Sequence, residues 1–290
     1  MRLLSRIAPD GERLGVLARD DAVVDVVDLL GDGRWTIARL LADPDGALAA
    51  ITLALAANPD VPARSVRDTV FLPPVVNPGK IIGVGRNYHE HAAEEGTIAP
   101  SAPILFAKLP NALAGEGGDI AWRAADTDQV DYEAELAVVI GRTARDVPVA
   151  QALDHVLGYT CLNDVSARDL QFGDGQWVRG KSLDTFCPMG PWIVTTDELP
   201  DPAALRLRCL VNGEVLQDAG TDEMVHGVAE LIAFCSRFMT LRPGDVIATG
   251  TPGGVGVFRT PPRFLCDGDE VVVEIDAIGR LTNRCRVLGG

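Results

Sequence analysis

A run of ten residues, DYEAELAVVI at Asp131–Ile140, is the feature that most constrains the fold, because it opens acidic and ends apolar. Successive side chains of a β-strand point to opposite faces. One face would carry the even-numbered residues: Tyr132, Ala134, Leu136, Val138 and Ile140. Glu133 and Glu135 begin the other face, which continues with Ala137 and Val139. A strand that is apolar on both faces lies inside a sheet, so the sequence predicts an interior strand headed by two carboxylates.

These two glutamates need a cation near them. Their Cα atoms would lie about 7 Å apart, given a rise of about 3.3 Å per residue, and buried unpaired carboxylates repel each other and lose hydration. A third carboxylate, Asp164, follows the strand-like segment Gly158–Asn163. Three oxygen ligands without a cysteine suit a hard ion such as Mg²⁺ or Mn²⁺. Glu133, Glu135 and Asp164 are therefore candidate metal ligands.

An alternative explanation needs no metal. Arg142, Arg168 or Lys181 could neutralise the same acids in ordinary salt bridges, because acidic clusters are often structural. The spacing of the residues does not choose between the two explanations.

A second candidate site lies in His89–Glu95, a segment whose alanines and glutamates favour a helix. Residues two apart do not face each other on a helix, so His89 and His91 are a poor zinc pair, whereas His91 and Glu94 share a face. A carboxylate beside an imidazole fixes its tautomer and raises its basicity, which makes His91 a candidate general base. The alternative is a solvated helix with an incidental pair.

Two glycine-rich segments look like nucleotide-binding loops but lack the defining residues. Gly83–Gly85 follows a predicted strand, yet Tyr88 stands where the dinucleotide motif requires a third glycine. Gly250–Gly256 is not followed by the Lys-Ser/Thr pair of a phosphate-binding loop. This second loop could bind a carboxylate through its backbone N–H groups, with Thr251 donating its hydroxyl, or it could be a tight turn between strands.

The remaining segments predict a β-rich mixed α+β fold. The expected strands are Arg2–Ile7, Arg13–Leu17, Val23–Val27, Ile81–Val84, Ile104–Ala107, Leu205–Val211, Glu214–Gln217, Val246–Thr249 and Val271–Ile275. The expected helices are Thr36–Ala42, Ala47–Ala57, Val147–Leu153 and Asp222–Met239. Three prolines and a glycine in Leu72–Lys80 predict a linker, so we expect a small N-terminal domain over residues 1–75 and a larger one over residues 76–290.

Composition limits the partners. Lys and Arg number 26 against 41 Asp and Glu, a formal net charge of −15, which argues against nucleic acid and against an anionic membrane surface. The longest apolar stretch, Ala47–Ala57, is well short of the roughly 20 residues that a membrane-spanning helix needs. No signal peptide is expected from the N-terminal sequence, and six scattered cysteines predict buried thiols in the reducing cytoplasm.

Six segments together resemble the fumarylacetoacetate hydrolase family, in family order and over roughly residues 75–286. They are IIGVGRNYHEHAAE (81–94), PILFAKLPNAL (103–113), VDYEAELAVVIGR (130–142), GYTCLNDVSARDLQ (158–171), WVRGKSLDTFCPMGPWIV (177–194) and GDVIATGTPGGVG (244–256). The resemblance implies a β-sandwich-roll catalytic domain with a small N-terminal α/β domain, a homodimer, and a Mg²⁺ or Mn²⁺ site. It also implies cleavage of a carbon–carbon bond in a 2,4-dioxo acid such as an acylpyruvate, or decarboxylation or isomerisation of a related oxo acid.

The resemblance assigns roles by position. Glu133, Glu135 and Asp164 match the family's metal ligands, His91 with Glu94 its water-activating pair, and Lys181 its active-site lysine. The positions expected to contact the oxo-acid substrate are Arg86, Arg168, Gln171 and Thr251.

A hydrolytic mechanism follows from these roles as a hypothesis. His91 would take a proton from water, hydroxide would attack the distal carbonyl, and Lys181 would stabilise the oxyanion while the metal holds the enolate fragment. The alternatives are an isomerase or decarboxylase that uses the same enolate, for example on 2-hydroxyhepta-2,4-diene-1,7-dioate or oxaloacetate, and a non-catalytic binding protein for metal or small acids.

Overall fold

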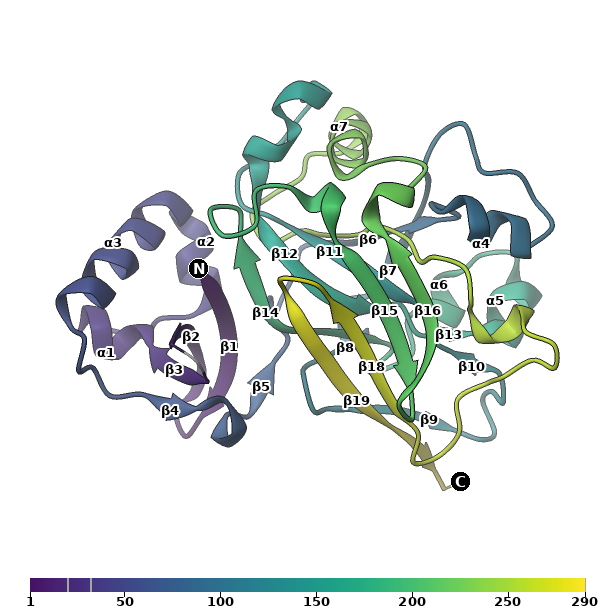
Figure 1. Cartoon of the computed structure of the whole chain (residues 1–290), viewed down its shortest axis with the longest axis horizontal. Helices are drawn as coiled ribbons and strands as arrows, with labels where there is room; N and C mark the ends of the chain where they lie inside the picture. The colour runs from purple at the N-terminus through teal and green to yellow at the C-terminus, as the bar shows by residue number, and fades with distance from the viewer. Residues whose placement is uncertain (20, 32, 290) are drawn as a thin grey trace.

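The computed structural model describes residues 1–19, 21–31 and 33–289 (Figure 1). Within these residues the chain forms a twelve-stranded sheet, a five-stranded sheet and a two-stranded ribbon, with short helices around them. The predicted β-rich mixed α+β class is confirmed.

The strands run in three groups. The large sheet contains β1 (Arg2–Ala8), β2 (Gly11–Arg19), β3 (Ala22–Asp25), β4 (Arg64–Ser65), β5 (Phe71–Leu72), β6 (Ile81–Gly85), β7 (Ile104–Lys108), β8 (Leu113–Ala114), β11 (Ala134–Ile140), β12 (Val156–Asn163), β14 (Cys187–Thr195) and β17 (Val246–Ala248). The five-stranded sheet contains β9 (Asp119–Arg123), β15 (Arg206–Val211), β16 (Glu214–Gly220), β18 (Glu270–Ile275) and β19 (Gly279–Leu288). The ribbon pairs β10 (Val130–Asp131) with β13 (Ser166–Ala167).

Helices lie at both ends of the molecule. The α-helices are α1 (Val26–Leu30), α2 (Ile37–Ala42), α3 (Pro44–Ala57), α4 (His89–Glu94), α5 (Arg168–Asp174), α6 (Val178–Lys181) and α7 (Val228–Phe238). The 3₁₀ helices are η1 (Val66–Asp68), η2 (Pro110–Ala112), η3 (Val149–His155), η4 (Pro202–Ala204), η5 (Thr221–Glu223) and η6 (Gly256–Phe258). In Figure 1, α1, α2 and α3 form a lobe at one end, whereas α4, α5 and α6 gather at the opposite end of the sheets.

Strand β11 is the interior strand that the sequence predicts. It pairs with β12 on one side and β17 on the other, and all of its residues are buried. Leu136 and Val138 on one face belong to one hydrophobic core, whereas Ala137 and Val139 on the other face belong to a second. Both faces of this strand therefore pack against apolar layers.

The predicted strand is nevertheless not continuous, because pairing breaks at Tyr132 and Glu133. Side-chain oxygens take the backbone N–H groups there: Asn163 Oδ1 accepts from Glu133 and Gln217 Oε1 accepts from Ala134, each at 3.0 Å. These bonds replace the ladder of a neighbouring strand, so Glu133 sits at a gap in the large sheet.

The N-terminal elements join the same sheet. Strand β1 pairs antiparallel with β14, and the second core contains Leu3, Leu14 and Leu40 together with Ala137 and Ile193. The large sheet therefore contains strands from both sides of residue 75, where the sequence predicts a domain boundary. The division into two domains stays a prediction.

Three other elements differ from expectation. Helix α7 begins at Val228 instead of Asp222, because Gly227 occupies the N-cap and its N–H donates to Glu230 Oε2 at 3.1 Å. The strand expected over Val23–Val27 ends at Asp25, which is the N-cap of α1, and the helix begins at Val26. The helix expected over Val147–Leu153 is the 3₁₀ helix η3, which starts after Pro148.

The cysteines follow the prediction with one exception. None of the six, all in the described part of the chain, forms a disulfide. Cys161, Cys187, Cys209, Cys235 and Cys285 are buried, whereas Cys266 is exposed, so the prediction of buried thiols is wrong for Cys266.

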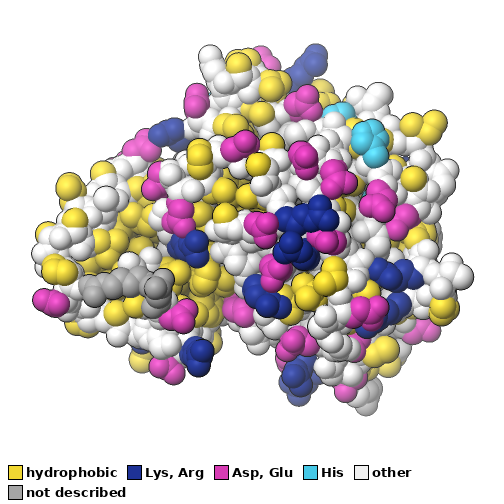
Figure 2. Space-filling view, viewed as in Figure 1, with side chains coloured by type: hydrophobic (Ala, Val, Ile, Leu, Met, Phe, Trp, Pro, Cys, Tyr) yellow, Lys and Arg dark blue, Asp and Glu magenta, His cyan; other side chains and the backbone are white. Residues whose placement is uncertain are grey.

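Among the described residues, no helix is both long enough and apolar enough to span a bilayer. On the face shown in Figure 2, basic side chains lie among acidic ones.

Gly158 and Gly173 offer a test of how tightly this sheet is packed. A Cβ at Gly158 would lie 2.2 Å from the carbonyl oxygen of Val194 on β14, whereas a Cβ at Gly173 in α5 would meet no described atom within 4 Å. We expect Gly158→Ala to lower the free energy of unfolding by about 3 kcal/mol, because the backbone of β14 cannot move away from the new methyl group as a flexible side chain could. Gly173→Ala should leave it unchanged or raise it by up to about 1 kcal/mol. Urea unfolding of both variants measures this, and equal effects would contradict the packing.

Candidate active site

The three predicted metal ligands lie together at the head of β11. One carboxylate oxygen from each of Glu133, Glu135 and Asp164 lies within 4.8 Å of the others, and all three side chains are buried. Glu133 occupies the gap before β11, Glu135 lies within the strand, and Asp164 directly follows β12. Antiparallel pairing of Ala134 with Asn163 brings the two strand ends into register.

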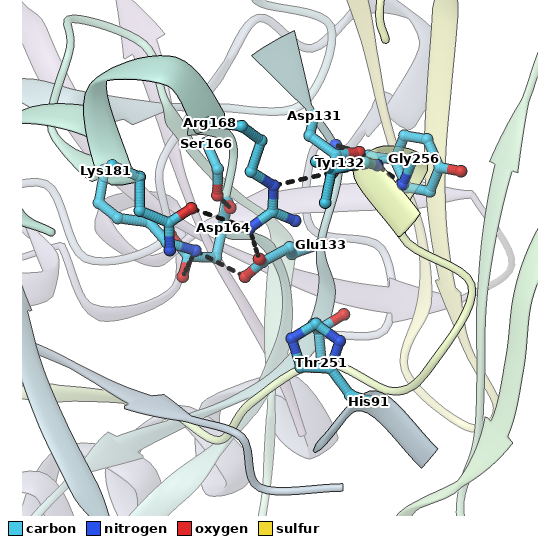
Figure 3. Close-up of polar contacts among 12 residues, drawn as sticks. His91, Asp131, Tyr132, Glu133, Asp164, Ser166, Arg168, Lys181, Thr251 and Gly256 are labelled. Atoms are coloured by element: carbon cyan, nitrogen blue, oxygen red, sulfur yellow. Dashed lines mark hydrogen bonds and ion pairs between the residues drawn. The ribbon is translucent and has the colours of Figure 1, made fainter. Parts of the chain in front are cut away.

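Basic side chains converge on Glu133 and Asp164 of this acidic triad, as Figure 3 shows. Lys181 Nζ donates to Glu133 Oε2 at 2.6 Å and to Asp164 Oδ2 at 2.7 Å. Arg168 Nη1 lies 2.7 Å from Glu133 Oε1. The salt bridges that the sequence offered as an alternative to metal thus form for Arg168 and Lys181. They do not form for Arg142, which pairs at the surface with Asp45 at 2.6 Å.

Two further charged residues of this cluster were missed from the sequence. Lys108 is fully buried at the end of β7, where Nζ donates to Asp164 Oδ1 at 2.5 Å and also to the Lys181 carbonyl. Asp131 Oδ2 accepts from Arg168 Nε at 2.8 Å. A lysine directly after the apolar run Ile104–Ala107 was the one available signal, since a charge at the end of a buried strand needs a partner.

The charges in this cluster do not cancel. Four buried carboxylates (Asp131, Glu133, Glu135 and Asp164) face three buried cations (Lys108, Arg168 and Lys181). Of these four carboxylates, Glu135 is the one for which the described residues show no ion pair; its Oε2 accepts the Gly250 N–H at 2.9 Å.

The pKa values reflect the same imbalance. Burial opposes the ionised form of Glu133, but Lys181 and Arg168 hold its pKa well below the usual value. Burial, together with the charges of Asp164 and Glu133, raises the pKa of Glu135 well above the usual value. Glu135 therefore needs either a proton or another cation beside it.

These residues fit a hard divalent cation. The donors are oxygens only, and each carboxylate oxygen that accepts one N–H keeps a second lone pair. One uncompensated carboxylate remains to balance added positive charge. Arg168 Nη2 is buried without a hydrogen-bond partner among the described residues, so a donor is also left for an anionic ligand beside the cation.

His91 projects from α4 towards this cluster from the side opposite Lys181 (Figure 3). Its Nδ1 lies 3.6 Å from Glu94 Oε2, and its Nε2 lies 3.3 Å from Glu95 Oε1. The predicted helix and the predicted pairing of His91 with Glu94 are both present, although 3.6 Å is longer than a hydrogen bond. Catalytic hydrogen bonds are often long before substrate binds and shorten in the complex.

The loop Gly250–Gly256 does bind carboxylates through its backbone. The N–H groups of Gly250, Gly254 and Gly256 donate to Glu135, Glu94 and Asp131 at 2.9, 2.7 and 2.8 Å. The predicted binding of carboxylates by backbone N–H groups is present, with each N–H on a different carboxylate of the chain itself, whereas the predicted donation from the Thr251 hydroxyl to a carboxylate is wrong.

The four predicted substrate contacts line one cavity together with Glu133 and Glu135 of the triad: Arg86, Arg168, Gln171 and Thr251. Gln171 Oε1 accepts from Arg168 Nη1 at 3.0 Å. The Thr251 hydroxyl donates to the Ala134 carbonyl at 3.0 Å and accepts from Gln217 Nε2 at 2.8 Å, so it is largely occupied by the fold.

Two aromatic rings form part of the cavity wall. Phe106 and Trp177 meet edge to face with centroids 5.3 Å apart. A Cβ at Gly83 would lie 2.2 Å from the Phe106 ring, and one at Gly85 would lie 2.5 Å from the Trp177 ring. The glycines of the Gly83–Gly85 segment therefore make room for the cavity wall.

Known proteins share this fold and sequence. Residues 80–286 match the family described as "Fumarylacetoacetate (FAA) hydrolase C-terminal". Over 289 residues the chain is 45% identical to "Oxaloacetate tautomerase FAHD2A, mitochondrial" of Bos taurus, which covers 98% of this chain and 91% of the relative.

Solved structures agree. Maleylpyruvate hydrolase from Sphingobium sp. SYK-6, in complex with manganese(II) and pyruvate, has a TM-score of 0.83 and 36% identity, with 100% of both chains covered. Fumarylacetoacetate hydrolase from Exiguobacterium antarcticum has a TM-score of 0.81 and 37% identity, with 99% of this chain and 100% of that chain covered. The chain therefore belongs to the fumarylacetoacetate hydrolase family of enzymes.

Proposed function

We propose that this chain is a divalent-metal-dependent enzyme that interconverts the keto and enol forms of a short 2-oxo dicarboxylic acid, with oxaloacetate as the first candidate. The observation that carries the proposal is a cavity that joins Glu133 and Glu135 of the acidic triad, a histidine and cationic side chains. The 45% identity to an oxaloacetate tautomerase over nearly the whole chain supports the same reaction.

The proposed metal is Mg²⁺ or Mn²⁺, held by Glu133, Glu135 and Asp164. A bound cation would supply Lewis-acid polarisation of the 2-oxo group. The oxygen-only donor set supports this choice, as does the manganese(II) of the Sphingobium relative. The homodimer and the cytoplasmic location stay predictions, and the bovine relative is named as mitochondrial.

The side chains supply the proton transfer. His91 Nε2 takes a proton from the substrate carbon next to the 2-oxo group, and the C–H electron pair becomes the C=C bond of the enol. The imidazolium then returns a proton at the 2-oxo oxygen, while Glu94 orients the ring. Arg168 Nη2 donates to a substrate carboxylate oxygen, and Lys181 supplies positive charge near the developing enolate.

Hydrolysis of a carbon–carbon bond is the second candidate, favoured by the full-length similarity to maleylpyruvate hydrolase. In that reaction His91 would deprotonate water, and the hydroxide would attack a carbonyl distal to the 2-oxo group. The two reactions share the base and the triad and differ in their products.

Product analysis decides between the reactions. With Mg²⁺ or Mn²⁺ added, the protein should accelerate the decay of the enol absorbance of oxaloacetate without forming pyruvate or carbon dioxide, and a chelator should abolish the effect. Pyruvate from oxaloacetate would indicate decarboxylation. Turnover of maleylpyruvate to pyruvate and a second acid, with no effect on oxaloacetate, would replace tautomerisation by hydrolysis.

Substitutions at Glu135 and Glu133 should have opposite effects on the metal-free protein. Glu135→Gln removes a buried carboxylate that the metal-free protein must either protonate or bury without a counterion, so we expect the melting temperature to rise, by about 2–4 °C per kcal/mol gained. Glu133→Gln leaves Lys181 and Arg168 short of a partner, and we expect a loss of about 3–5 kcal/mol. Both variants should lose the stabilisation that Mg²⁺ or Mn²⁺ gives the wild type. Thermal unfolding with and without metal measures this, and a lower melting temperature for Glu135→Gln would contradict the charge imbalance.

His91→Ala should slow turnover at least about a hundredfold, the usual range for loss of a general base, while the metal-induced shift in melting temperature remains. His89→Ala, at an exposed position of the same helix, is the matched control and should retain activity. Equal rates for His91→Ala and the wild type would remove His91 from the reaction.

A further inference from the structure

Glu95 places a carboxylate in the cavity wall. Neither the packing of the fold nor the proposed proton transfer requires a carboxylate there. Glu95 directly follows α4, and its side chain is 18% exposed. Its Oε2 accepts from Arg86 Nε at 2.6 Å, and its Oε1 lies 3.3 Å from His91 Nε2. The Glu95 carboxylate thus contacts both the Arg86 guanidinium and His91 Nε2, the imidazole nitrogen that Glu94 does not contact.

Arg86 differs from the other cations around the cavity in what it binds. Lys108, Arg168 and Lys181 are paired with buried acids of the cluster. Among the described residues, Glu95 is the partner of Arg86, and both side chains are partly exposed to solvent. An ion pair that solvent reaches contributes little free energy, so an incoming carboxylate can replace Glu95.

The backbone conformation of Arg86 also points to a functional role for this residue. Its φ is 56°, in the left-handed region that side chains other than glycine and asparagine seldom adopt. Such conformations persist where the surrounding structure enforces them, and they are found most often at ligand sites. The turn after β6 directs Arg86 to the cavity that Glu133, Arg168 and Lys181 also line.

We propose that Glu95 occupies the place of the substrate's second carboxylate and that substrate binding displaces it. This rests on the proposed function, because it assigns the end of the 2-oxo dicarboxylate that lies away from the triad. The far carboxylate replaces Glu95 at Arg86, Glu95 moves away, and His91 Nε2 becomes free to take the proton. A 2-oxo acid with one carboxylate leaves Glu95 on Arg86 and His91 covered, so Arg86 and Glu95 together select dicarboxylates.

Equilibrium binding tests this without relying on turnover. Calorimetry of the full chain with Mg²⁺ would compare malate with lactate, which lacks the second carboxylate. The wild type should prefer malate. Glu95→Gln removes the competing charge and should tighten malate binding about tenfold while lactate binding changes less than about twofold, a gain of the size expected for one charge-assisted hydrogen bond.

Two variants serve as controls. Glu90→Gln makes the same charge change at an exposed position of α4 and should leave both affinities unchanged. Arg86→Gln should abolish the preference for malate, both alone and combined with Glu95→Gln.

The outcomes separate the explanations. Weaker malate binding by Glu95→Gln would show that Glu95 only supports Arg86 and His91, and would overturn the proposal. The proposal would also be overturned if Glu95→Gln increased the affinity for malate and for lactate equally, or if neither the wild type nor Glu95→Gln bound malate. A wild type that prefers malate but does not tautomerise oxaloacetate would contradict the proposed function alone, and the shift caused by Glu95→Gln would still decide the role of Glu95.

Discussion

The buried charges around β11 are the constraint on which the rest of the structure depends. Removing one partner of a buried ion pair costs about 3–5 kcal/mol, a large part of the stability of a whole domain. Asp131, Glu133 and Asp164 therefore require Arg168, Lys181 and Lys108, which come from α5, α6 and β7. Elements more than 50 residues apart along the chain have to meet at this point, and the same requirement places the candidate active site.

Backbone N–H groups extend this cluster to the helix that carries the base. The loop Gly250–Gly256 binds Glu135 of the triad, Asp131 beside it and Glu94 of α4. Because Glu94 is held by the same loop as Glu135, the position of α4 is tied to the position of the triad. A glycine-rich segment that lacks a phosphate-binding sequence thus serves as a frame for carboxylates, since its N–H groups are free to point to one side.

The sequence predicts those parts of the candidate site that follow from periodicity within a short segment. The two faces of β11, the carboxylates at its head and the helical spacing of His91 and Glu94 all follow from alternation within a few residues. The partners of these side chains could not be predicted from local periodicity. Lys108 meets Asp164 across 56 residues, and Gln217 caps Ala134 across 83, so only the tertiary fold brings them together. The break before β11 was missed for the same reason, because side chains from distant strands take the N–H groups that a neighbouring strand would bind.

Tautomerisation and hydrolysis differ in this site by what stands next to His91. Hydrolysis needs a water molecule between the imidazole and a carbonyl carbon, whereas tautomerisation needs the substrate's C–H bond there. The aromatic wall of the cavity already packs against the glycines of β6, so Phe106 and Trp177 cannot retreat in that direction. Space beside His91 is therefore limited on the side of β6, and the same base and the same triad serve either reaction, according to whether the substrate's C–H bond or a water molecule occupies that space.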